Sequence, residues 1–385
     1  MAVEREQFAL SLSQRNILSL EMRYPGTSIN IISATIHISG RLDFQLLAKT
    51  LNLIILSDDT MRARIARRDG DVLQEYVPYS EEQFPVYDFS LTDPDGFSHW
   101  ETAVTRQPVQ LYGEPLCRFF LFRTGEGEGG VLVKTHHIVF DGWSLVLLCN
   151  RIARTYLTLL SGKEPEMEKS PDYRLHVEAE RDYLASHNYV RDEKYWRALL
   201  EKPAESASFK DQRGAQVSPV GRRRSYRLPE ILNHAISDFC REHRVSPFAP
   251  YYMALAIAAK RMGCGKRMTV GVPVHNRTDL TARMTTGMFV STLPLVMELD
   301  EDWTAEQFCD SLSENWLDLL RHQRCPYERI EAMPGRNGRL FSVALSYQDN
   351  LSFRGEDATV RFSGRWNYSG YQAEQLCIHL TNLED

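Results

Sequence analysis

The chain has 385 residues, of which 43% are hydrophobic and 25% charged, and its formal net charge is -6 at pH 7. A single hydrophobic core stops growing before this length, so the composition predicts a globular protein with two lobes. The negative charge argues against nucleic-acid binding, and the sequence shows neither a signal peptide nor an apolar stretch of membrane-spanning length.

The seven cysteines are scattered and lack CxxC spacing. An odd number without such spacing indicates reduced thiols rather than a disulfide framework or a zinc site. We therefore expect a cytoplasmic protein without a bound metal.

The first half of the chain predicts alternating β and α elements. A strand at residues 34–39 precedes a helix at 44–56, and a hairpin joins 117–124 to 131–137 across a glycine-rich loop. A long helix then begins at Trp143 or Ser144, because apolar residues recur at helical spacing until Gly162.

The second half predicts a similar order. A polar linker at residues 161–172 is followed by a helix at 173–200 and a mobile surface loop at 201–220. The remaining expected elements are a strand at 223–228, a helix opened by Pro229, a helix at 250–260, a strand at 268–272, a helix at 304–322 and a strand at 341–347. This repetition predicts a pseudo-duplicated mixed α/β (α+β) protein with lobes at residues 1–165 and 166–385.

Residues 135–144 contain two adjacent histidines, His136 and His137, followed by Asp141 and Gly142. The β-branched residues before them predict a strand, in which successive side chains point to opposite faces. One imidazole therefore points into a cleft and the other into packing, where its nitrogens need partners. A neutral imidazole takes up a proton near neutral pH, and Gly142 lets a thin substrate arm approach the backbone. The alternative is a pair of core histidines beside an Asp-Gly turn.

The segment HHIVFDGWS resembles the HHxxxDG signature of condensation domains from nonribosomal peptide synthetases. Further segments resemble the other motifs of that family in the family's order. They are LSLSQRNIL (10–18), MRARI (61–65), SPDYRLHVEAE (170–180), GMFVSTLPLV (287–296), HQRCPYERI (322–330) and GRNGRLFSVALSYQDN (335–350).

Two departures from the family pattern bear on the subclass. Ser57 and Asp58 stand where the second motif usually has Arg-His, and Ser291 stands where the late motif usually has Asn. Heterocyclising relatives carry aspartates in place of the histidine pair, so His136 and His137 exclude that class. Epimerising relatives keep the pair, and the conventional late motif argues against them.

The resemblance implies two chloramphenicol-acetyltransferase-like lobes in a pseudo-dimeric V, with a central tunnel and the histidine motif at its midpoint. It implies amide formation between an upstream acyl or peptidyl thioester and the α-amine of a carrier-bound aminoacyl acceptor. No cofactor is bound by the domain itself; the substrates are carried on 4'-phosphopantetheine or, for a starter type, on coenzyme A. Acyl or peptidyl carrier domains on both sides and an adjacent adenylation domain are the implied partners, with no nucleic acid, membrane or metal.

By the same resemblance His137 is the catalytic histidine and His136 supports it. Asp141 is structural and pairs with the arginine of the second motif, which maps onto Arg62. Gly142 gives the substrate arm access. The expected tunnel residues are Val139, Trp143, Ser144 and Ser291, and the Ser144 hydroxyl is a candidate helix N-cap.

Alternatives remain open at this point. A non-catalytic recruitment relative would be expected to lose the histidine motif, and a free-standing coenzyme A-dependent acyltransferase to have a full-length C-terminal end. The family continues past the strand that closes this chain, so the resemblance implies a truncated end. Only about ten residues precede the first motif, which favours a starter type that acylates the first amino acid.

Overall fold

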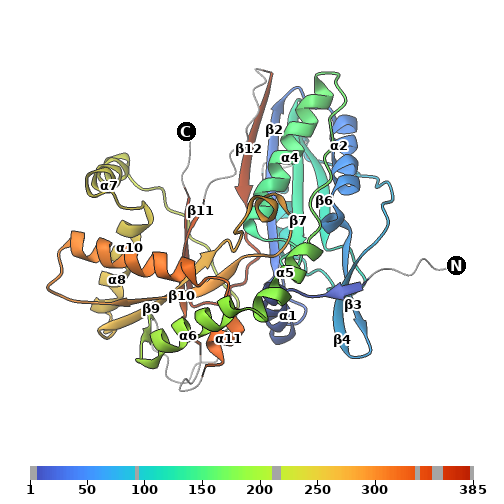
Figure 1. The fold of residues 1–385 in the computed structure, drawn as a ribbon. Helices are drawn as coiled ribbons and strands as arrows, with labels where there is room; N and C mark the ends of the chain where they lie inside the picture. The colour runs from blue at the N-terminus through green and yellow to red at the C-terminus, as the bar shows by residue number, and fades with distance from the viewer. Residues whose placement is uncertain (1–6, 92–94, 210–217, 334–338, 349–358, 382–385) are drawn as a thin grey trace.

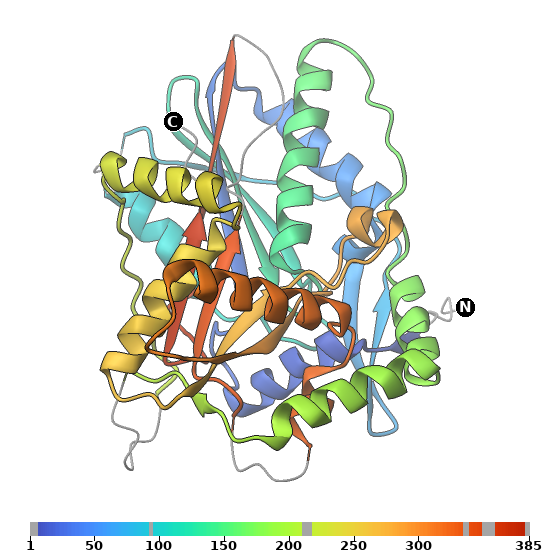
Figure 2. The same ribbon diagram turned by 60° about the vertical axis from the view of Figure 1, so that its left-hand side comes forward.

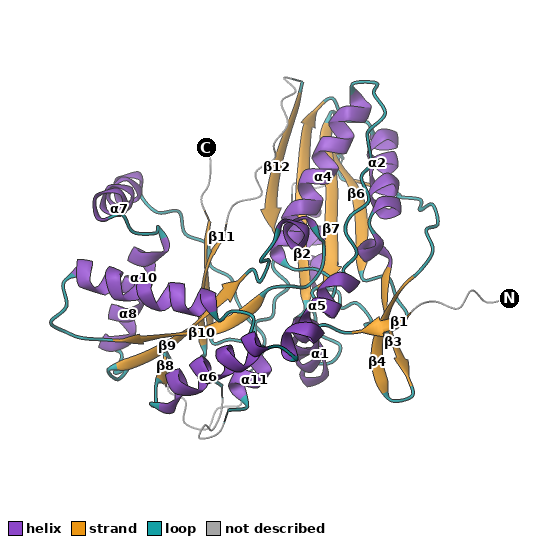
Figure 3. Ribbon diagram, viewed as in Figure 1, coloured by secondary structure: helices purple, strands orange, loops and turns teal. Residues whose placement is uncertain are grey.

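The computed structural model describes residues 7–91, 95–209, 218–333, 339–348 and 359–381. Two sheets lie side by side, each with its own hydrophobic core (Figure 1). Helices and strands alternate through both halves of the chain, as the sequence predicts (Figure 3).

In the described residues, the first sheet has the strand order β12-β2-β7-β6-β5. Its bounds are β2 Ile31–Gly40, β5 Val86–Asp88, β6 Cys117–Gly125, β7 Glu128–His136 and β12 Val360–Trp366. A smaller sheet joins β1 Gln7–Ala9, β4 Asp71–Tyr76 and β3 Ala63–Arg68. The helices of this half are α1 Leu12–Arg23, α2 Phe44–Ser57, the 3-10 helix η1 Asp59–Arg62, α3 Gly96–Arg106 and α4 Gly142–Leu160.

Alternation along β2 explains why this sheet is covered on both faces. Ile36 and Ile38 are fully buried in the core that α2 and α4 complete, whereas His37 points to the opposite face and contacts Phe97 of α3. The apolar faces of α2 and α4 therefore lie together on one side of the sheet (Figure 1).

The second sheet has the order β10-β9-β11-β13, and the short strand β8 also pairs with β9. Its bounds are β8 Glu205–Ser206, β9 Arg267–Val274, β10 Ser291–Glu298, β11 Val343–Gln348 and β13 Leu376–Thr381. The helices are α5 Arg174–Leu184, α6 His187–Glu201, α7 Glu230–His243, α8 Phe248–Arg261, α9 Leu280–Met284, α10 Ala305–Arg321 and α11 Tyr327–Glu331. Helices α8 and α10 pack on one face of this sheet (Figure 2).

Strand β12 does not follow the division of the chain into two halves. It comes from the second half but pairs antiparallel with β2, with Phe362 opposite Ile38 (Figure 1). No strand is predicted from the sequence at residues 360–366. Apart from this strand, the predicted lobe boundary between residues 165 and 166 separates the residues of the two cores. The boundary stays a prediction.

Two expected elements are wrong. Residues 223–228 form no strand and are largely exposed; Arg223 instead donates from its side chain to the Trp366 carbonyl at the end of β12. The single helix expected at 173–200 is two helices, since Ser186 accepts a hydrogen bond from the Tyr189 amide and begins α6. The expected loop at 201–220 contains β8 and the fully buried Ala207, and its residues 210–217 lie outside the described part.

Candidate active site

The histidine pair lies where β7 meets the loop before α4. His136 ends β7 and is 1% exposed, so it is the imidazole that points into packing. Its Nδ1 accepts a hydrogen bond from the Ile138 amide at 3.1 Å, and its Nε2 lies 3.4 Å from Oε2 of Glu21. An Nδ1 that accepts carries no proton, so the proton is on Nε2 and points towards the carboxylate.

His137 is the partly exposed member of the pair. Its amide donates to the Asn30 carbonyl at 2.7 Å, which fixes the backbone at the end of the sheet. Burial lowers the pKa of the His137 imidazole, and the negative charge of Asp141 opposes this effect without cancelling it. The side chain is therefore neutral near pH 7 and able to accept a proton.

Asp141 is fully buried and makes an ion pair across the lobes. Arg277, which follows β9, donates to its two carboxylate oxygens at 2.7 and 3.2 Å. The amides of Phe289 and Val290 donate to the same side chain at 3.1 and 3.2 Å. Burial alone raises the pKa of Asp141, but the Arg277 charge and these hydrogen bonds hold it below its usual value.

The prediction that Asp141 pairs with Arg62 is wrong. Arg62 instead forms an ion pair with Asp59 and donates to the carbonyls of Ile55, Leu56 and Val77. Its guanidinium is occupied by groups close to it in the sequence and does not reach the histidine loop. A buried aspartate requires a cation, but the sequence offers no signal that selects Arg277 among the many arginines.

The N-cap of α4 is Asp141, whose carboxylate accepts the Ser144 amide at 2.8 Å. The Ser144 hydroxyl, expected as the cap, instead donates to the Gly287 carbonyl and accepts from the Gly287 amide and from Arg277. A hydroxyl has one proton and two lone pairs. The side chain is therefore fully used in joining the lobes and is not a tunnel wall.

The other residues expected at the tunnel differ in how far they are exposed. Val139 is 2% exposed within the first core and is not a wall residue. Trp143 is partly exposed, and its Nε1 donates to the Arg283 carbonyl at 2.9 Å. Ser291 begins β10 and is 8% exposed. A Cβ atom at Gly142 would make one ordinary contact, with the Trp366 ring at 3.9 Å, so there is room for a methyl group beside this backbone position.

A second cluster of buried polar groups joins the lobes at Asp58, one of the residues that depart from the family pattern. Its carboxylate is 1% exposed and accepts a hydrogen bond from the Thr286 hydroxyl at 2.8 Å. It also accepts from Arg151 and Ser170, both at 2.9 Å. Sequence reasoning noted Asp58 only as a departure; its position as a buried anionic centre was missed.

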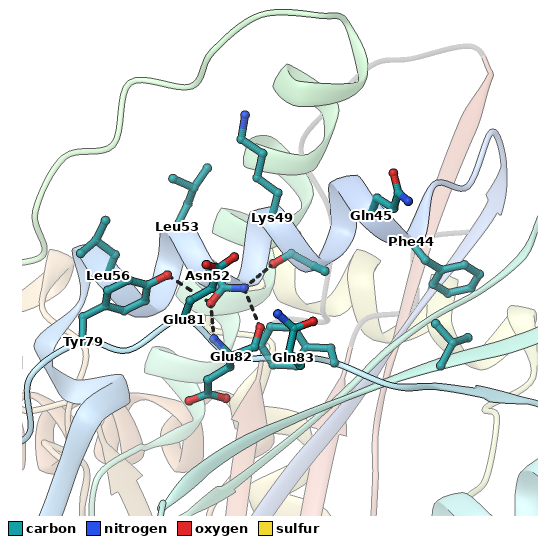
Figure 4. Close-up of a pocket in the computed structure, with 13 residues that line it drawn as sticks. Phe44, Gln45, Lys49, Asn52, Leu53, Leu56, Tyr79, Glu81, Glu82 and Gln83 are labelled. Atoms are coloured by element: carbon teal, nitrogen blue, oxygen red, sulfur yellow. Dashed lines mark hydrogen bonds between the residues drawn. The ribbon is translucent and has the colours of Figure 1, made fainter.

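A groove of about 700 Å³ lies elsewhere, on the outer side of α2 (Figure 4). None of the expected site residues lines it. Its walls are Phe44, Gln45, Ala48, Lys49, Asn52, Leu53, Leu56, Tyr79, Glu81, Glu82, Gln83, Phe84 and Val86. Across the described residues, no cluster of three His, Cys, Asp or Glu side chains is placed to hold a metal ion.

Comparison with known proteins agrees with this arrangement. The family model of the condensation domain matches residues 4–373. The chain belongs to the condensation-domain family. It is 29% identical to surfactin synthase subunit 1 of Bacillus subtilis (strain 168) over 390 residues, which cover 98% of this chain and 11% of that protein. The chain thus spans about a tenth of the length of this relative.

Solved condensation domains have the same fold. The first condensation domain of the calcium-dependent antibiotic synthetase, in complex with substrate analogue 2a, is 25% identical with a TM-score of 0.85, covering 98% of this chain and 88% of that one. A mutant of the starter condensation domain of rhizomide synthetase RzmA, in complex with C8-CoA, is 23% identical with a TM-score of 0.84, covering 97% and 86%.

The expected family and the mixed α/β fold class are therefore confirmed. Condensation domains of nonribosomal peptide synthetases catalyse amide bond formation, which is an acyl-transfer reaction. No helix among the described residues combines the length and the apolar character that crossing a membrane requires.

Proposed function

We propose that this condensation domain joins an acyl or peptidyl thioester, carried on its upstream side, to the α-amine of an aminoacyl group carried on its downstream side. The observation that supports this most strongly is the state of His137. Its imidazole is neutral and partly exposed, its backbone is fixed by Asn30, and the nearby Gly142 carries no side chain and leaves room for a Cβ atom.

The reaction requires one bond to form and one to break. The amine nitrogen attacks the thioester carbonyl carbon, a tetrahedral oxyanion forms, and the carbon–sulfur bond then breaks. The nitrogen loses a proton, and the leaving sulfur takes one up and departs as a thiol. An aminoacyl amine has a pKa of about 8, so a sizeable fraction is already deprotonated near neutral pH.

Two effects of different size would accelerate this step. Holding the two arms head to head supplies roughly 7 to 11 kcal/mol through effective molarity. A neutral His137 imidazole, which has one donor and one acceptor nitrogen, adds about 10²- to 10⁴-fold by taking the amine proton or by donating to the oxyanion. Positioning of the substrates is therefore the larger contribution.

We further propose that both substrates arrive on 4'-phosphopantetheine arms through a tunnel between the lobes, past Gly142, Trp143 and Ser291. The partners would be the carrier domains on the donor and acceptor sides, with an adenylation domain adjacent. The seven cysteines are all free, which fits the reducing cytoplasm.

The direct test replaces His137 with alanine. His137→Ala should abolish amide formation from carrier-bound substrates, measured by mass spectrometry, while the melting temperature stays close to that of the wild type. The matched control is His99→Ala, which removes an exposed histidine of α3 and should keep full activity. Near wild-type product formation by His137→Ala would overturn the catalytic assignment.

The donor carrier distinguishes an internal domain from a starter type. The similarity to a starter domain solved with C8-CoA supports testing coenzyme A esters as donors. With the downstream carrier loaded with an amino acid, an acyl-coenzyme A and a peptidyl carrier would be offered in separate reactions. Product from the acyl-coenzyme A is expected for a starter type, and product from the peptidyl donor alone would rule that type out.

A further inference from the structure

Glu21 lies in the last turn of α1 and points towards the histidine loop. Its side chain is 13% exposed and that of His136 is 2% exposed, so the pair is shielded from solvent. Its Oε2 accepts a hydrogen bond from the Asn30 amide at 2.8 Å and lies 3.4 Å from Nε2 of His136. Burial raises the pKa of Glu21, but its bonds to His136 and Asn30 outweigh this and lower it. The carboxylate is therefore ionised at neutral pH.

Two contacts select which nitrogen of His136 carries the proton: the Ile138 amide at Nδ1 and the Glu21 carboxylate at Nε2. Because this amide donates to Nδ1, a proton on Nδ1 would bring two donors face to face. The proton is therefore on Nε2. The Glu21 carboxylate lies next to this buried N–H group and stabilises it. In the described part of the chain Nε2 has no hydrogen bond of good geometry, and the Glu21 carboxylate at 3.4 Å is the charged group that pairs with it.

The contacts around Glu21 continue to the backbone of His137 itself. Asn30 holds the carboxylate with its side chain and accepts the His137 amide with its carbonyl. Gln14, on the same helix as Glu21, donates to the Ile138 carbonyl at 2.8 Å. Helix α1 and Asn30 thus fix the peptide groups on both sides of His137.

We infer that Glu21 is a positioning residue for the reaction. It holds His136 in the Nε2-protonated tautomer, and this tautomer keeps the Ile138 amide bonded and the His137 ring directed at the substrates. Glu21 touches no substrate in this scheme. The inference rests on the proposed function for its catalytic consequence, but the tautomer of His136 is a property of the resting protein.

The test compares two substitutions of the same residue. Glu21→Gln keeps an amide oxygen that accepts from Nε2, so it should preserve both the tautomer and most of the turnover. Glu21→Leu removes the acceptor and should lower kcat by about 100-fold, the size of effect that a misplacement of about 1 Å produces, with little change in KM. Thermal melting of both variants separates this effect from unfolding, and Glu21→Ala replaces the leucine variant if that one does not fold.

The tautomer is read from the nitrogen chemical shifts of ¹⁵N-labelled histidine, with the His136 signals assigned by their absence in His136→Gln. The wild type and Glu21→Gln should show a protonated Nε2 and a bare Nδ1, and Glu21→Leu should show a mixture. His176→Gln is the matched control, because it removes another Glu–His pair of the same 13% exposure and leaves Glu180 bonded to the Leu12 amide at the start of α1. It should leave the His136 tautomer unchanged.

Two results would overturn the inference: an unchanged tautomer in Glu21→Leu, or a loss of kcat in Glu21→Gln equal to that in Glu21→Leu. If neither the wild type nor any variant forms an amide, the proposed function fails. The nitrogen chemical shifts then still decide whether Glu21 sets the tautomer of His136.

Discussion

At the scale of single residues, the polar side chains at and after the end of β7 differ in whether the protein itself satisfies them. His136, Asp141 and Ser144 are buried and bonded within the protein, whereas His137 keeps a partly exposed ring. His136 is the last residue of β7 and His137 the first of the turn, whereas Asp141 and Ser144 are held by the start of α4. This arrangement leaves His137 as the one residue of the group that is free to meet a substrate.

The first prediction concerns the charge of His137. Because burial lowers its pKa, the folded-state pKa should lie below the ordinary value of about 6.5. The imidazole should remain neutral until the pH falls below that value. An NMR titration of its ring signals, assigned with His137→Ala, measures this directly. A folded-state pKa above that of a model peptide would show that Asp141 dominates over burial.

The second prediction concerns the buried ion pair. Asp141→Asn and Arg277→Ala each leave one buried charge unpaired and should each cost roughly 3 to 5 kcal/mol of stability. Chemical denaturation measures the loss. The double variant Asp141→Asn/Arg277→Met should recover part of it, because no unpaired charge remains. A stable but inactive Asp141→Asn protein would instead make the aspartate a catalytic group.

Sequence reasoning identified the histidine loop but not the partners that hold it. The adjacent histidines and the following Asp-Gly are local signals, so His137 and Asp141 were singled out correctly as residues of one loop. Arg277 lies 136 positions from Asp141 and Glu21 more than a hundred from His136. Such pairings arise from the tertiary fold, and no spacing in the sequence encodes them.

At the scale of elements, the junction between β7 and α4 fixes the residues on either side of the histidine pair. Helix α4 begins at Gly142, with the Asp141 carboxylate as its cap. The capping aspartate is also the partner of Arg277, so the start of the helix and the contact between the lobes depend on one side chain. Gly142, next to this fixed point, leaves space for a Cβ atom whose contact would be the Trp366 ring at 3.9 Å.

The third prediction tests that space. Gly142→Leu places a branched side chain where a pantetheine arm should pass, so condensation of tethered substrates should fail, as followed by mass spectrometry. Stability should hold or improve, because leucine favours a helix more than glycine does. Gly142→Ala is the control, since its Cβ would make only an ordinary contact at 3.9 Å with Trp366. Small untethered amines should still react with Gly142→Leu; equal loss with both acceptors would indicate a collapsed loop.

Elements with strong internal periodicity were predicted well, and those that depend on a distant neighbour were not. Helix α4 and the β6–β7 hairpin appear where hydrophobic spacing placed them. Residues 223–228 pair with no strand, although the Arg223 side chain reaches the end of the edge strand β12, and β12 itself pairs with a strand more than 300 residues away. Strand formation requires a partner, which local propensity does not report.

At the scale of the whole molecule, the segment at residues 285–290 joins the second half of the chain to the first. Its backbone bonds to Ser144 and Asp141 on one side and to Ser13 and Tyr173 on the other. A Cβ atom at Gly287 would lie 2.1 Å from the Tyr173 ring, so this close approach requires glycine. The relative placement of the lobes is therefore fixed beside the histidine loop itself.

The last prediction concerns the second contact between the lobes, at Asp58. The Thr286 hydroxyl donates to this carboxylate from the second half, Arg151 and the Thr60 amide donate from the first half, and the Ser170 hydroxyl donates from the linker at residues 161–172. Thr286→Val removes that one bond at nearly constant volume and leaves Asp58 with its other partners. The expected cost is about 1 kcal/mol, the usual net value of a hydrogen bond.

The loss of this bond should loosen the contact between the lobes more than it lowers the free energy of unfolding. Without this bond, the amides of residues 286–290 should exchange hydrogen faster, and small-angle scattering should show a larger radius of gyration. Thr285→Val is the matched control, because the hydroxyl of this buried neighbour bonds to the Thr281 carbonyl beside its own helix and not across the lobes. If the two valine variants exchange at the same rate and scatter alike, the Asp58 cluster does not hold the lobes together, and their placement depends on the other contacts, among them the Asp141–Arg277 pair.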